Sequence, residues 1–84
     1  MKKKKSANPR SMNAIDECIA ARIREHRLAA NMSQDALGKA SGVSFQQIQK
    51  YESGINCVTA SRLYEICKVL NVPLSSMFRR DPKA

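Results

Sequence analysis

Residues 33–54 read SQDALGKASGVSFQQIQKYESG, and this stretch decides the fold. It predicts two short helices joined by a tight turn at Gly42, because glycine adopts a positive φ without steric cost. Gly38 is the small residue that two closely crossing helices need at their contact. The second helix carries a polar face of glutamines and a lysine, which can hydrogen-bond base edges and phosphates. The stretch therefore predicts two helices held at one angle to each other, the second of which presents a polar surface.

Helical patterns continue on both sides of this stretch. Apolar residues recur at helical spacing in residues 14–30 and 60–70, which Asn13 and Thr59 can cap. Pro73 forces an extended step, after which residues 74–79 predict a short last helix. With the helices over 34–40 and 45–53, the prediction is a compact five-helix, all-α domain without strands. The residues expected to face its core outside the central stretch are Ile15, Cys18, Ile19, Ile23, Leu63, Ile66, Cys67, Leu70, Leu74, Met77 and Phe78.

Composition limits the chain to one small domain, and its charge favours a polyanionic partner. Its 84 residues leave no room for a second core, and 43% of them are hydrophobic with few aromatics, which favours an aliphatic helical core. Lys and Arg outnumber Asp and Glu by 15 to 7, giving a net charge of +8. Nucleic acid is the partner that this charge favours, and the alternative is a basic surface that only maintains solubility.

Three segments are expected along the chain. Residues 1–12 form a basic arm with Lys2 to Lys5, residues 13–79 form the domain, and residues 80–84 form a tail. The arm either wraps a duplex or is a solvated tail. Leu37, Val43 and Ile48 are expected to fill the angle between the two central helices.

Several classes of chemistry are not expected. Three cysteines without a CxxC spacing argue against a zinc site or a disulfide framework, and they fit a reducing cytoplasm. No apolar run is long enough to span a membrane. We find no catalytic Ser-His-Asp set, no paired carboxylates and no phosphate-cradling glycine loop. The expectation is a non-enzymatic cytoplasmic protein with no metal, cofactor or small-molecule ligand.

The central pattern resembles a known family. Gln34-x-x-Leu37-Gly38-x-x-x-Gly42-Val43-Ser44-x-x-x-Ile48-x-x-Tyr51-Glu52-x-Gly54 is similar to the central unit of Cro/cI-type domains. These are the lambda-repressor-like, or XRE-family, helix-turn-helix DNA-binding domains, and the similarity extends over residues 15–78. It implies five helices and sequence-specific binding to double-stranded DNA.

The resemblance implies that the second central helix reads bases. Phe45, Gln46 and Lys50 take the positions that touch base edges, and Gln49 is a weaker candidate for a base or phosphate contact. Gln can bond adenine through two hydrogen bonds, and Lys can bond guanine O6 and N7. The alternatives are a core role for Phe45 and a simple solvated face for Gln46 and Lys50.

The same resemblance implies phosphate contacts around this helix. Gln34 opens a helix whose backbone N–H groups favour anions, and it takes the place of a phosphate-contacting glutamine. The loop over residues 55–58 lacks the basic residues that many relatives have there. The further residues expected near phosphates are Ser44, Ser53, Asn56, Thr59 and Arg62.

Two structural roles also follow from the resemblance. Arg27 and Glu52 correspond to an ion pair that orients the reading helix, and the alternative is two solvated charges. A corner used by relatives for self-association corresponds here to Val72, Pro73, Leu74 and Met77.

The function expected from these observations is a DNA-binding transcriptional regulator located at the nucleoid. It would repress by occupying a palindromic operator as a homodimer. The alternative is a protein-interaction role on the same fold, as an antitoxin or a coactivator adapter. RNA binding is a weaker option because RRM and KH signatures are absent.

Overall fold

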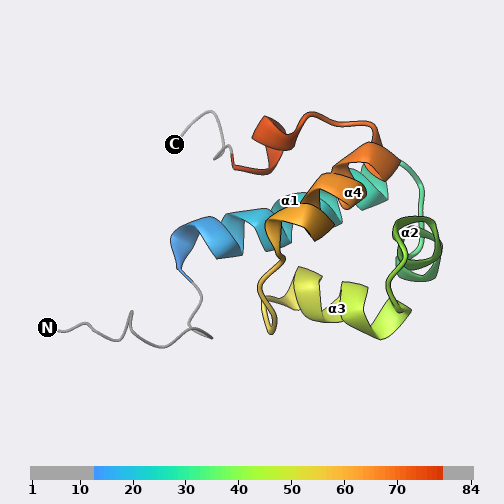
Figure 1. The fold of residues 1–84 in the computed structure, drawn as a ribbon, viewed down its shortest axis with the longest axis horizontal. Helices are drawn as coiled ribbons and strands as arrows, with labels where there is room; N and C mark the ends of the chain where they lie inside the picture. Colours follow the sequence, from blue (N-terminus) through green and yellow to red (C-terminus); the bar gives the residue numbers. More distant parts are fainter. Residues whose placement is uncertain (1–12, 79–84) are drawn as a thin grey trace, which may run out of the picture.

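The computed structural model describes residues 13–78, and these form a helical domain (Figure 1). Its elements are α1 (Ala14–Ala29), α2 (Gln34–Ser41), α3 (Phe45–Ser53), α4 (Ala60–Leu70) and the 3-10 helix η2 (Leu74–Met77). Within residues 13–78 there is no strand, so the all-α prediction is confirmed. The arm and the tail that the sequence predicts lie outside the described residues.

The predicted fifth α-helix is wrong in type and in orientation. Residues 74–77 make a single 3-10 turn, and Leu74 and Phe78 stay exposed while only Met77 enters the core. One short turn after Pro73 can direct only one of these side chains inward. Residues 13–78 therefore form four α-helices and one 3-10 turn.

Side-chain caps fix where the helices begin. At α1, the Asn13 side chain accepts from the Asp16 backbone N–H at 2.9 Å, and the Asp16 carboxylate accepts from the Asn13 N–H at 3.1 Å. This reciprocal capping box satisfies two donors that a helix start leaves without partners. Ser33, Ser44 and Thr59 cap the starts of the next three α-helices by a single hydrogen bond, each accepting from the backbone N–H three residues on.

Left-handed residues end the helices. Asn31 follows α1 with a φ of 58°, and Asn71 ends α4 with a φ of 60°. Gly42 ends α2 with a φ of 82° and lets the chain turn directly into α3.

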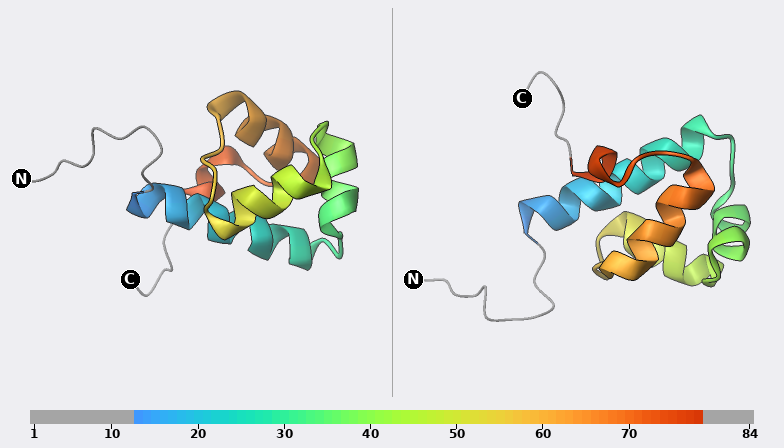
Figure 2. Two further views of the ribbon diagram at one scale, coloured as in Figure 1. Left: turned by 90° about the horizontal axis from the view of Figure 1, so that it is seen from below. Right: turned by 45° about the horizontal axis from the view of Figure 1, so that its top comes forward.

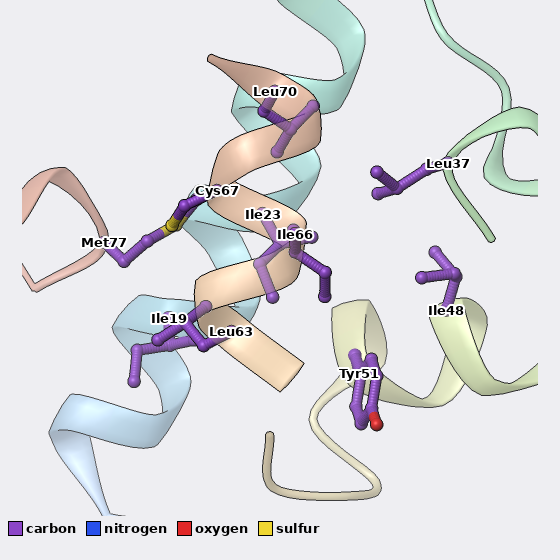
Figure 3. Packing of buried hydrophobic residues seen from close by; sticks show 10 residues of the cluster. All are labelled: Ile19, Ile23, Leu37, Ile48, Tyr51, Leu63, Ile66, Cys67, Leu70 and Met77. Atoms are coloured by element: carbon purple, nitrogen blue, oxygen red, sulfur yellow. The ribbon is translucent and has the colours of Figure 1, made fainter. Parts of the chain in front are cut away.

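The core lies between the four α-helices and η2, and each of these elements contributes buried side chains to it. Figure 3 shows its side chains converging from all five elements. Cys67 is buried, and burial raises the pKa of its thiol above the ordinary value. The buried cluster comprises Ile19, Ile23, Leu37, Ile48, Tyr51, Leu63, Ile66, Cys67, Leu70 and Met77.

Three further expected core residues, besides Leu74 and Phe78, are less buried than the sequence predicts. Ile15 is exposed because the first turn of α1 extends beyond the elements that cover the rest of the helix, as Figure 1 shows. Val43, in the turn between α2 and α3, is partly buried against the core, and Cys18 is also partly exposed. Periodicity alone does not reveal where the neighbouring elements end.

The turn between α2 and α3 sets the direction of α3. In Figure 1, α2 is viewed nearly end-on while α3 runs across the picture. A Cβ atom on Gly38 would lie 2.6 Å from the Val43 carbonyl oxygen, so only glycine permits this close approach. From α4, Arg62 Nη1 donates to the Ser41 carbonyl oxygen at 2.8 Å and ties the turn to the core.

The last element of the domain packs against the first helix. After α4, η2 packs against α1, which the two further views in Figure 2 also show. Among residues 13–78, none of the helices is long and apolar enough to cross a membrane.

Candidate nucleic-acid interface

The outer face of α3 is polar and accessible. Ile48 and Tyr51 on the inner face of the helix are buried in the core. On the outer face, the side chains of Gln46, Gln49 and Lys50 are exposed. Phe45 leaves 40% of its surface exposed at the helix start and does not belong to the buried cluster, so the structure argues against a core role for it. The helix thus presents hydrogen-bonding side chains to a partner while its apolar side holds it in place.

An open hollow lies beside this face, and half of the ten predicted contact residues line it. Its volume is about 530 Å³, and α1, the start of α2 and α3 all contribute side chains to it. Candidates for base reading and for phosphate binding therefore share one surface. The residues that line the hollow are Arg24, Gln34, Gln46, Gln49, Lys50, Glu52, Ser53 and Ile55.

A buried ion pair fixes α3 to α1 behind the hollow. Arg27 Nε donates to Glu52 Oε2 at 2.6 Å, and Arg27 Nη2 donates to Glu52 Oε1 at 3.0 Å. The two side chains are only 8% and 4% exposed, so these are not two solvated charges. Arg27 Nη1 also donates to the Met32 carbonyl oxygen at 2.8 Å, which satisfies a backbone group after α1. Two parallel hydrogen bonds hold the planar groups in one orientation.

Glu52 also positions Gln34. The Gln34 Nε2 group donates to Glu52 Oε1 at 3.1 Å, which joins the start of α2 to the end of α3. An amide nitrogen carries two hydrogens, so the second one stays available for another acceptor. Glu52 thereby links the residue expected at a phosphate to the helix expected at the bases.

The other residues predicted to bind phosphate already make hydrogen bonds within the domain, some through their side chains and some through the backbone. Ser44 and Thr59 are caps, while the Ser53 hydroxyl donates to the Lys50 carbonyl oxygen at 3.3 Å at the edge of the hollow. Asn56 is half-buried, and its backbone N–H donates to the Lys50 carbonyl oxygen at 3.3 Å. Arg62 is directed at Ser41, so one of its donors is already occupied. Their role toward phosphate stays a prediction.

The predicted self-association corner forms a second hollow. Val72, Pro73 and Leu74 line it together with Tyr64 and Lys68 of α4, whose ammonium lies 5.4 Å from the Tyr64 ring centre. Met77 is completely buried in the core and has no surface to offer a partner. The surface available for self-association at this corner is therefore smaller than the sequence predicts.

Sequence reasoning missed Arg24 as a residue of the interface. Arg24 lies one helical turn before Arg27, and this spacing places both on the side of α1 that faces α3. That signal was present in the sequence, but only the fold shows that α1 borders the reading helix. In the part of the chain that the structure describes, no group of three or more His, Cys, Asp or Glu side chains could hold a metal ion.

Comparisons with known proteins agree with this geometry. A family model described as helix-turn-helix matches residues 23–76. An uncharacterized HTH-type transcriptional regulator of Sinorhizobium medicae is 49% identical over 75 residues, covering 89% of this chain and 54% of the relative. The transcriptional regulator in the ATPase CF(0) region of Rhodospirillum rubrum is 43% identical over 81 residues, covering 92% of this chain and 75% of the relative.

A solved structure extends the similarity to a protein on DNA. The P22 c2 repressor protein, solved in complex with a synthetic operator, is 28% identical, with a TM-score of 0.68. The match covers 75% of this chain and 96% of the repressor. The fold and the polar α3 define a DNA-binding domain of the helix-turn-helix class.

This chain belongs to the lambda-repressor-like helix-turn-helix family of transcriptional regulators. It spans about half the length of the Sinorhizobium medicae relative.

Proposed function

We propose that this chain is a non-enzymatic, sequence-specific DNA-binding protein that represses transcription by occupying a palindromic operator. The single observation that carries the proposal is the accessible face of α3, held by the buried Arg27–Glu52 pair beside Gln34. Phe45, Gln46 and Lys50 read base edges in the major groove, with Phe45 against a thymine methyl group. Gln49 makes an additional base or phosphate contact.

Phosphate contacts position the reading helix. Gln34 binds a phosphate at the start of α2 through its remaining amide hydrogen and the backbone N–H groups there. Further phosphate contacts come from Ser44, Ser53, Asn56, Thr59 and Arg62. The net charge of +8 supports a polyanionic partner, and the nucleoid in the cytoplasm is the place where such a partner is found.

A homodimer has the same two-fold symmetry as a palindromic operator. Val72, Pro73 and Leu74 provide a two-fold contact at the second hollow, where Leu74 and Tyr64 are exposed apolar side chains. The two reading helices would then lie about 34 Å apart, one turn of the duplex. The Lys2 to Lys5 arm, which lies outside the described residues, adds affinity for any duplex.

Selection of bound sites from random duplex DNA tests the proposal. We expect enrichment of one palindromic sequence with half-sites centred about one helical turn apart, protected symmetrically in footprinting. Recovery of sequences without any shared motif would contradict sequence-specific binding. It would favour the alternative of an antitoxin-like or adapter role, in which the same surface contacts a protein.

A further inference from the structure

We propose that Arg24 on α1 is a phosphate-binding residue and that the hollow beside α3 receives a phosphodiester of duplex DNA. This inference rests on the proposed function, since it assigns one more contact to the same interface. It adds α1 to the helices that the sequence assigns to DNA.

Arg24 is the side chain that α1 contributes to the hollow. It lines this surface together with Gln34 from the start of α2 and Lys50 from α3. A strand whose bases are read by Gln46 and Lys50 must pass its backbone alongside α3. The hollow, which these two side chains also line, therefore lies on the path of that backbone, and Arg24 borders it from α1.

The charges in the hollow favour an anion. Glu52 is the acidic residue among those that line it, and its two carboxylate oxygens accept from Arg27 and from Gln34. Its charge is thus compensated by a buried guanidinium. Arg24 and Lys50 add two exposed cations to the same surface.

Arg24 also differs from the neighbouring arginines in its partners. Arg22 donates to Glu25 at 2.8 Å, and Arg27 is committed to Glu52. Among residues 13–78, Arg24 makes no ion pair, so its five N–H donors can bind a phosphate without breaking a contact in the protein. A planar guanidinium binds phosphate oxygens through two hydrogen bonds.

Arg22 supplies a matched control. It lies two residues before Arg24, about 200° around the helix at roughly 100° per residue, so it faces away from the hollow. Removing either arginine takes one positive charge from the same helix. Only the loss of Arg24 should remove a bound phosphate.

The experiment measures the affinity of the full chain and of Arg24→Gln, Arg24→Lys and Arg22→Gln for a selected operator duplex and a scrambled duplex across a salt series. We expect Arg24→Gln to weaken both duplexes by a similar factor and to reduce the log–log salt slope by about 0.9. Arg24→Lys should restore the slope, and Arg22→Gln should change it by less than half as much. Circular dichroism establishes that each variant is folded.

The outcomes separate this inference from the proposed function. If the unmodified chain prefers the operator but Arg24→Gln has the salt slope of Arg22→Gln, the phosphate assignment is wrong. A loss confined to the operator duplex, with an unchanged slope, would also overturn it, because that result indicates a base contact. If the unmodified chain binds neither duplex, the proposed function and this inference both fail.

Discussion

The Glu52 carboxylate connects three parts of the interface at the scale of single residues. It accepts hydrogen bonds from Arg27 on α1 and from Gln34 on α2 while it belongs to α3. A buried pair of this kind is weak evidence for high stability, because burial of both charges has a desolvation cost. Its contribution is orientation: it gives α3 one position relative to α1 and to the start of α2.

Glu52→Ala should destabilise the fold by about 3–5 kcal/mol, because Arg27 would remain buried without a counter-charge. Chemical unfolding of Glu52→Ala, Arg27→Met and the double variant measures the coupling between the two side chains. Independent effects of the two substitutions would show that the pair is not coupled. As a control, Glu25→Ala breaks the exposed pair with Arg22 and should change stability by no more than about 1 kcal/mol.

At the scale of elements, the contact between α2 and α3 depends on the absence of a side chain. The Cβ of an alanine at Gly38 would meet the Val43 carbonyl oxygen at 2.6 Å, and this oxygen is backbone and cannot turn aside. Gly38→Ala should therefore cost about 1–3 kcal/mol despite the higher helix propensity of alanine. Thermal unfolding measures this loss.

Lys39→Ala is the control for that substitution. Lys39 is the next residue on α2, it is exposed, and its ammonium lies 3.3 Å from Asp35 in a surface pair worth little energy. Its replacement should leave stability within about 0.5 kcal/mol. Equal stability of Gly38→Ala and the unmodified chain would mean that α2 and α3 cross more loosely than the structure shows.

The sequence predicted which helices form better than it predicted where they end and which other elements pack against them. Apolar spacing located α1 and α4, the pattern of residues 33–54 located α2 and α3, and Gly38 and Gly42 have the roles that their positions predict. Local patterns could not show that residues 74–77 form only one 3-10 turn or that Ile15 lies beyond the covered part of α1. Both depend on which elements pack against each other.

Only part of the interface could be predicted from the sequence, because the rest also depends on which elements pack against each other. Helical phase shows that Gln46 and Lys50 share the outer face of α3. Arg24 and Lys50 line one hollow from two different helices, and Arg62 donates to the Ser41 carbonyl oxygen, so the fold brings together residues that are distant in the sequence. Such contacts follow from the packing of whole helices and cannot be derived from spacing along one of them.

At the scale of the whole molecule, self-association decides how the chain meets a palindrome. Leu74 is 42% exposed at the second hollow, beside Val72 and Pro73. Leu74→Glu places a charge in the proposed two-fold contact and should reduce cooperative binding to a full operator. Affinity for a single half-site should stay the same. Titration of full and half operators by fluorescence anisotropy measures both quantities.

A charge at another exposed leucine serves as the control for self-association. Leu28 on α1 is 49% exposed and does not line the second hollow. Leu28→Glu should therefore leave cooperativity unchanged. If Leu74→Glu and Leu28→Glu have the same effect, the corner at Pro73 is not the site of the dimer contact.

The central claim is that α3 reads the DNA sequence, and one measurement tests it most directly. The affinities of Gln46→Ala and Lys50→Ala are determined on the selected operator and on a scrambled duplex, with Lys39→Ala as a control for the loss of one charge. We predict that each variant of α3 loses about 1–3 kcal/mol on the operator and relaxes the preference at particular base pairs, while binding to the scrambled duplex changes much less. Equal losses on both duplexes would contradict the claim and show that α3 does not read the sequence.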